Sequence, residues 1–215
     1  SDCTITVTDN ASNPSSTLLL SAFTVDLTAP TVTSISPSDN ESEVSISDNI
    51  TVIFSEAIDN SSVTTNTDNS SCYGTLMVSS DNFTNCIIMS SSPKRSSDNT
   101  TFSVETYDNL SYSTTYKIRI TTGVKDFAEN TLGSDYETST GFSTVPLFVV
   151  VGDLGRIFTS SDNGTTWTQR TSGISTNLQS VAYGGGTFVA SGNSGVILSS
   201  SDGTSWVSET SNGTS

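Results

Sequence analysis

The segment YKIRITTGVKDFAENTLGSDYETSTGFST (residues 116–144) decides the fold class. Its two ends are strand-like runs rich in Tyr, Ile, Thr and Phe, and its middle is a cluster of turn-forming residues. No helical repeat of apolar residues competes with this pattern. Similar runs recur upstream, so we expect strands at residues 31–36, 49–54, 74–79, 85–90, 100–105, 115–122 and 140–145, with one short helical turn within 55–63. Seven short strands over roughly 115 residues predict an all-β, Ig-like sandwich over residues 30–145.

Several motifs of this unit resemble the bacterial Ig-like domains of S-layer proteins and surface adhesins. The motifs are Pro30 with Pro37, FSEAI (54–58), VKDFAEN (124–130) and the final FST (142–144). Glu129 departs from the pattern, because such domains usually have Gly at that place. The resemblance implies an Ig-like module of a surface protein.

Residues 1–29 resemble the end of another domain of the same kind. Two strand-like runs, at residues 3–8 and 18–25, flank a turn cluster, and the sequence then reaches the FTVDLTAP junction (23–30). Two strands alone cannot bury a core. We therefore interpret residues 1–29 as the C-terminal hairpin of a truncated Ig-like domain.

Residues 146–215 contain an internal repeat of 40 residues. The sequence FVVVGDLGRIFTSSD (148–162) aligns with FVASGNSGVILSSSD (188–202). An all-β repeat of this length matches one four-stranded propeller blade. The first copy supplies three strand-like runs and the second supplies four. We therefore expect two blades of an incomplete β-propeller, completed by further sequence or by neighbouring subunits.

Each repeat ends in a turn signature, SSDNGTTW (160–167) or SSDGTSW (200–206), that resembles the Asp-box of sialidase-type and related propellers. The resemblance implies structural roles for Asp162, Gly164, Trp167, Asp202, Gly203 and Trp206. The Asp accepts backbone N–H bonds across a hairpin, the Gly adopts a positive φ, and the Trp covers the turn. Such turns lie away from propeller active sites. The signature therefore indicates the architecture and says almost nothing about activity.

Nine Asp-Asn pairs occur in the chain, and each has Ser or Thr two residues after the Asn. Composition alone predicts about one pair by chance. None has Pro between the Asn and the hydroxyl residue, so each is an N-glycosylation acceptor motif. The acceptors are Asn10, Asn40, Asn49, Asn60, Asn69, Asn82, Asn99, Asn109 and Asn163, and a tenth, Asn212, lacks the Asp. The alternative is plain Asx-turn chemistry, which explains where the pairs occur but not the invariable hydroxyl.

Composition excludes several function classes. The 215 residues include 22 acidic and 7 basic ones and no His, which gives a net charge of −15. This balance argues against nucleic acid, because neutralising phosphates takes clusters of Lys and Arg. The longest aliphatic-aromatic run, LFVVV (147–151), is far shorter than a membrane span, so no membrane insertion is expected. Without His, neither a His-based triad nor a His metal ligand is available.

The three cysteines are Cys3, Cys72 and Cys86. Cys72 and Cys86 are close enough in sequence to join two neighbouring strands, so we expect a disulfide between them in an oxidising compartment. Two free buried thiols are the alternative. Cys3 then has no partner within the chain.

The inventory of reactive groups is poor, and we expect no catalytic residue. Arg156 and Arg170 are too few for a sialidase carboxylate site. Glu56 with Asp59 could in principle act as an acid–base pair, but we expect a solvated or turn-forming pair. Four carboxylates on turns, those of Asp126, Glu129, Glu56 and Asp59, could bind calcium, although no EF-hand or nonapeptide motif supports it. We expect no cofactor other than covalent N-glycans.

Two function classes remain. The first is a structural or adhesive module of a large, heavily N-glycosylated surface or filament protein. The second is a non-catalytic part of a secreted carbohydrate-active or ligand-binding propeller enzyme. Both place the protein outside the cell or at its surface. The expected partners are neighbouring domains, identical subunits in a fibre, and glycans or cell surfaces.

Overall fold

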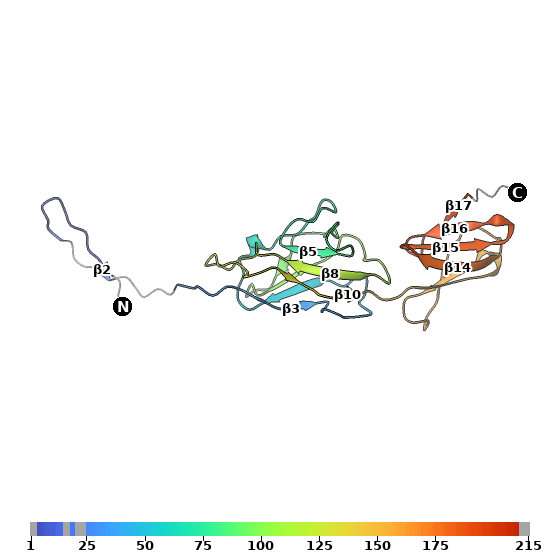
Figure 1. Cartoon of the computed structure of the whole chain (residues 1–215), viewed down its shortest axis with the longest axis horizontal. Coiled ribbons are helices and arrows are strands. Elements are labelled where there is room, and N and C mark those ends of the chain that lie inside the picture. Colours follow the sequence, from blue (N-terminus) through green and yellow to red (C-terminus); the bar gives the residue numbers. More distant parts are fainter. Residues whose placement is uncertain (1–3, 15–17, 20–24, 211–215) are drawn as a thin grey trace.

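The chain is all-β, with three parts that follow one another along its longest axis (Figure 1). The computed structural model describes residues 4–14, 18–19 and 25–210. The first part is the antiparallel pair of β1 (Thr4–Ile5) and β2 (Leu18–Leu19). The second is a two-sheet sandwich, and the third is a pair of smaller sheets built by the sequence repeat.

The sandwich consists of two antiparallel sheets. One sheet has the order β3 (Val32–Ser36), β4 (Ile50–Phe54), β7 (Thr101–Val104) and β6 (Lys94–Arg95). The other has the order β10 (Phe142–Ser143), β8 (Thr115–Ile120) and β5 (Leu76–Ser79), and β9 (Tyr136–Glu137) also pairs with β8. A 3₁₀ turn, η1 (Asn60–Ser62), follows β4, which confirms the expected helical turn.

The core of the sandwich lies between these sheets because apolar residues alternate along the central strands. In β8, Tyr116, Ile118 and Ile120 are buried, and the residues between them are partly exposed. The facing sheet contributes Phe54 and Phe102, whose rings pack edge to face at 5.9 Å. One cluster of buried side chains joins both sheets, as in an Ig-like sandwich.

Two local expectations are wrong. Residues 85–90 form no strand: Met89 makes one isolated bridge, with Thr106. The backbone N–H groups there bond to different segments, Cys86 to Ser70 and Ile87 to Val78, so no continuous ladder forms. In addition, β6 and β9 were not among the expected strands.

The C-terminal part contains a three-stranded and a four-stranded sheet, both antiparallel. The first is β11 (Phe148–Val151), β12 (Ile157–Ser160) and β13 (Thr168–Arg170). The second is β14 (Leu178–Gly184), β15 (Thr187–Gly192), β16 (Ile197–Ser200) and β17 (Val207–Glu209). A 3₁₀ turn stands at the same place in each repeat, η2 (Asp153–Gly155) and η3 (Asn193–Gly195). The strand counts follow the repeat, whereas the closed propeller remains a prediction.

The sandwich contacts the C-terminal sheets through the ends of the two Asp-box-like turns. Asn163 Nδ2 donates to Glu43 Oε1 at 3.1 Å, and Asp202 and Thr204 of the second turn line one pocket together with Ile46 and Tyr112 of the sandwich. Within the described ranges, no helix has the length and apolarity that a membrane span requires.

Candidate functional site

The nine Asp-Asn motifs are surface features of the fold. Eight of the nine asparagines are exposed, and Asn99 is half-buried. Four of them, Asn40, Asn82, Asn99 and Asn163, have a positive φ between 55° and 66°, a conformation that Asn tolerates better than most residues. Asn212 lies outside the described residues. The motifs therefore lie on the surface, and several of them occupy tight turns.

Turn chemistry accounts for many of the aspartates. Five carboxylates accept a backbone N–H from two or four residues further along the chain, which is an Asx-type turn: Asp9, Asp59, Asp81, Asp98 and Asp162. Hydrogen bonds lower the pKa of all five, because they favour the charged carboxylate. The Asp of the motif thus has a structural role that needs no glycan.

The hydroxyl two residues after the Asn has no comparable uniform role. Thr51 donates to Ser103 Oγ, Ser62 donates to the Asp59 carbonyl, and Thr84 donates to the Asp81 carbonyl. For the other six, no hydroxyl hydrogen bond to another described residue is present: Ser12, Ser42, Ser71, Thr101, Ser111 and Thr165. Turn chemistry therefore leaves most of these hydroxyls without a function in the fold.

The amide nitrogens that would carry glycans are largely available. Among the nine asparagines, and within the described part of the chain, only the Asn163 Nδ2 donates a hydrogen bond, to Glu43. Asn99 is engaged through its oxygen, which accepts from Arg95, and Asn69 Oδ1 accepts from the Ser71 N–H at 2.8 Å. Asn163 and Asn99 are therefore the sites most constrained by their surroundings.

One motif carboxylate joins distant segments. Asp39 Oδ2 accepts from the Ser139 N–H at 3.0 Å and the Ser139 hydroxyl at 2.7 Å. Its Oδ1 accepts from the N–H groups of Thr140 at 3.0 Å and Gly141 at 2.7 Å. The Ser139 hydroxyl bond, together with the three backbone bonds, lowers the pKa of Asp39 to about 2. The sequence gives no signal for this contact, because its partners lie 100 to 102 residues away.

A second candidate is a cluster of three carboxylates where the N-terminal segment meets the sandwich. Oxygen atoms of Asp26, Glu56 and Asp126 all lie within 4.8 Å of one another. Burial, followed by repulsion from the other two carboxylates, raises the pKa of Glu56, whose buried Oε1 accepts no hydrogen bond in the described structure. Carboxylate oxygens are the ligand type of calcium.

The cluster differs from the four residues that the sequence suggested. Asp126 is buried, and its carboxylate accepts from the Ala128 and Asn130 N–H groups. Burial raises the pKa of Asp126, but the hydrogen bonds from Asn130 and Ala128 outweigh it, so the pKa is lowered. Glu129 instead pairs with Lys125. Asp59 instead caps η1, accepting from the Ser61 N–H, so an acid–base pair with Glu56 has no geometric support.

The Asp-box-like turns have the local contacts that their sequence predicts. Asp162 accepts from the Thr166 N–H and hydroxyl, and the Thr166 hydroxyl bond comes first among those that lower its pKa to about 2. Gly164 has φ 83°, and the Trp167 indole N–H donates to its carbonyl at 3.0 Å.

The second turn is built in the same way. Asp202 accepts from the N–H groups of Thr204 and Ser205; burial opposes its ionisation, yet the hydrogen bonds hold its pKa well below the usual range. Gly203 has φ 68°, and Trp206 donates to its carbonyl at 2.9 Å. The contacts of these six residues lie within the turns themselves.

Cys72 and Cys86 form a disulfide, with their Cα atoms 5.0 Å apart. The bond ties two loops together, since residues 85–90 are no strand. Cys3 lies outside the described residues.

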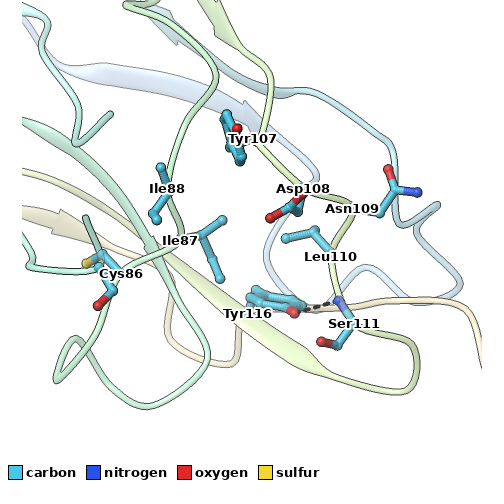
Figure 2. A pocket seen from close by; sticks show the side chains of 10 residues that line it. Cys86, Ile87, Ile88, Tyr107, Asp108, Asn109, Leu110, Ser111 and Tyr116 are labelled. Atoms are coloured by element: carbon cyan, nitrogen blue, oxygen red, sulfur yellow. Dashed lines mark hydrogen bonds between the residues drawn. The ribbon is translucent and has the colours of Figure 1, made fainter. Parts of the chain in front are cut away.

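Cys86 also lines a cavity of about 250 Å³ that includes Tyr107, Leu110 and Tyr116. Figure 2 shows Tyr116 accepting the Ser111 N–H at the base of this cavity, while the Asn109 side chain points away from Tyr107 and Cys86. Asn109 is nevertheless among the residues that line the cavity.

One residue that the sequence analysis missed connects the two repeats. Asn177 accepts the Leu154 N–H through Oδ1 at 3.0 Å and accepts the Asn193 N–H through its backbone carbonyl at 2.9 Å. It thereby holds η2 of the first repeat and η3 of the second. A comparison of the two repeats could not find it, because its counterpart position in the first repeat belongs to the sandwich.

Known proteins resemble the middle of this chain. The family model described as a bacterial Ig-like domain matches residues 26–144, more than half of the chain. The chain belongs to the bacterial Ig-like domain family. No curated protein matches at a significant level.

Solved structures of a surface layer protein, SbsC, are similar in part. Its domains 1–6 match with 14% identity and a TM-score of 0.39, over 86% of this chain and 24% of that one. The N-terminal part of the S-layer protein SbsC matches with 16% identity and a TM-score of 0.39, over 80% of this chain and 40% of that one. The chain thus spans about a quarter to two fifths of the length of these proteins.

Proposed function

We propose that this chain is a structural, adhesive module of a large, N-glycosylated protein at the cell surface or in an extracellular filament. The single observation that carries the proposal is the set of acceptor motifs whose hydroxyls the fold does not use. Nine motifs lie on the surface, and six of the nine hydroxyls make no hydrogen bond to another described residue. A requirement outside the fold explains their presence, and N-glycosylation requires that hydroxyl.

The architecture supports the same proposal. A bacterial Ig-like domain between two further β units gives an extended arrangement (Figure 1). A coat of glycans would cover exposed strand edges, which otherwise pair with other chains. In the described residues, the carboxylates of Asp59, Glu129 and the Glu56 cluster are engaged in a turn, an ion pair and the cluster itself. These features suit a spacer or fibre better than an enzyme.

The proposal is tested by separating the acceptor role of the hydroxyl from its structural role. Ser42→Ala removes a hydroxyl that has no hydrogen bond to another described residue, so it should abolish the glycan on Asn40 in the native host and leave stability unchanged. Ser62→Ala is the matched variant, because Ser62 also donates to the Asp59 and Lys125 carbonyls and accepts from Lys125 N. It should lose both the glycan on Asn60 and some stability. An unmodified Asn40 in the unaltered protein from the native host would overturn the proposal.

A further inference from the structure

The two repeats pack face to face through a defined interface. Val149, Val151 and Ile157 share one face of the first sheet, called here its rear face. This face packs against the front face of the second sheet, which carries Ala190 and Leu198. Ile157, Ala190 and Leu198 are fully buried, so the interface excludes water at its centre.

The second repeat has its own rear face, and that face is uncovered. The residues 40 positions after Val149 and Ile157 are Val189 and Ile197. Val189 of the second repeat is 44% exposed, whereas Val149 of the first is half-buried. Likewise, Ile197 is half-buried, whereas Ile157 is fully buried. In the turns, Gly155 is buried and Gly195 is exposed. Ser191 stands at the place of Val151, so the apolar surface recurs in part, through Val189 and Ile197, and this second occurrence is uncovered.

The polar part of the interface is also repeated. In the first repeat, the η2 turn offers the Leu154 N–H to Asn177 Oδ1, and the Gly152 carbonyl accepts the Leu178 N–H at 3.0 Å. The corresponding η3 turn has the same backbone, with φ 57° at Ser194 against 58° at Leu154. Within the described ranges, the Ser194 N–H has no acceptor.

From this symmetry we infer that the rear face of the second repeat is a docking site for a further repeat of the same type. That repeat would supply an apolar front face and an Asn at the position equivalent to Asn177. The Asn side chain would accept the Ser194 N–H as Asn177 accepts that of Leu154. The interface would continue the one that already joins the two repeats, because Val189, Ile197 and the η3 turn repeat Val149, Ile157 and the η2 turn at the 40-residue period.

A second copy of this chain fits less well than a further repeat. The residue 40 positions before Asn177 is Glu137, which is paired with Lys117 and Arg119 in the sandwich. The first repeat of another copy therefore brings no Asn to η3. The Asn177 of another copy is already bonded to its own Leu154. The site thus selects a repeat that carries its own unengaged Asn.

The test is an extended chain in which a duplicate of residues 174–213 follows residue 213 directly. This puts a second Asn 40 residues after Asn177. Hydrogen exchange of the Ser194 amide should slow at least about fivefold, as expected for one added hydrogen bond. The Leu154 amide is the internal reference and should not change. The same extended chain with the duplicated Asn changed to Ala is the control, and its Ser194 amide should exchange faster than that of the Asn form. Equal exchange in both forms with a folded third repeat overturns the inference.

A second measurement does not depend on folding of the added repeat. Asn177→Ala in the original chain should speed exchange of the Leu154 amide by a similar factor. No change there would show that the Asn contact does not hold the interface, and would overturn the inference. Ser194 protection that rises with the concentration of the original chain would identify a second copy as the occupant and would also overturn it.

Discussion

Replacing Asp39 by Asn should destabilise the sandwich by about 2 kcal/mol. The carboxylate accepts four hydrogen bonds, two on each oxygen, from residues 139–141. The Asn side chain keeps one acceptor oxygen and turns an N–H₂ group toward the other two donors, so two bonds are lost. Hydrogen bonds to charged groups are each worth about 1.5–3 kcal/mol. Asp39 is exposed, and solvent screening reduces their sum to about 2 kcal/mol.

The dependence on pH distinguishes this cause from a general loss of packing. The pKa of Asp39 in the folded protein is about 2, below its ordinary value of 3.8. A depressed carboxylate pKa contributes stability that is complete above the unfolded pKa and is lost as pH falls through the folded pKa. The difference between the original protein and Asp39→Asn should therefore be constant from pH 7 to about 5 and shrink between about pH 4 and 2.

The assay is urea unfolding of unglycosylated protein, followed by circular dichroism. The two tryptophans, Trp167 and Trp206, both lie in the repeats, so their fluorescence follows unfolding of the repeats and not of the sandwich. The unfolding transition seen by fluorescence should therefore change little. Asp108→Asn is the matched control, because Asp108 is another motif carboxylate and makes no hydrogen bond to a described residue. Neither substitution creates a new acceptor motif. Equal stability of the two variants, or a difference that persists unchanged to pH 2, would refute the reasoning.

Three further changes test other parts of the structure. Glu56→Gln should stabilise the protein at pH 7 in EDTA, because burial and two neighbouring carboxylates raise the pKa of Glu56. Urea unfolding should show that the gain vanishes at acidic pH as Glu56 protonates, and destabilisation at pH 7 would contradict it. Gly141→Ala should lower the free energy of unfolding by about 2 kcal/mol or more in the same assay, because the added Cβ would lie 2.2 Å from the Tyr116 carbonyl oxygen and the residue has φ +85°. Gly133→Ala is its control: the added Cβ meets no atom within 4 Å, so the stability should hardly change. Removing the Cys72–Cys86 bond, which spans 14 residues, should cost about 3 kcal/mol, and intact-mass analysis of unreduced, alkylated protein should find no free thiol at either position.

Much of the fold could be read from the sequence because it rests on local patterns. Alternation of apolar residues places Tyr116, Ile118 and Ile120 on one face of a strand. This alternation can be recognised within the eight residues 115–122. The 40-residue repeat similarly predicts two sheets with equivalent strands. The strand predicted at residues 85–90 is wrong because composition cannot show which partners the backbone groups of this segment will bond to. The N–H groups of Cys86 and Ile87 bond to two different segments.

The candidate sites depended more on distant contacts. The Asp-Asn pattern located exposed turns correctly, since Asx chemistry acts within a few residues. Two of these features join segments far apart in the chain, and no spacing rule reveals them. They are the hydrogen bonds from residues 139–141 to the Asp39 carboxylate and the cluster of Asp26, Glu56 and Asp126. Asn177 was missed for the same reason. Its role depends on two turns that the fold brings together.

Glycopeptide mass spectrometry on protein purified from its native source tests the central claim most directly. The spectra should show glycans on most of the nine motif asparagines, including Asn40 and Asn82, whose side-chain amides make no hydrogen bond to a described residue. Asn99, half-buried beside Arg95, and Asn163, bonded to Glu43, should have the lowest occupancy. Unmodified Asn at most of the nine positions would contradict the account and leave the Asp-Asn motifs as turn chemistry alone.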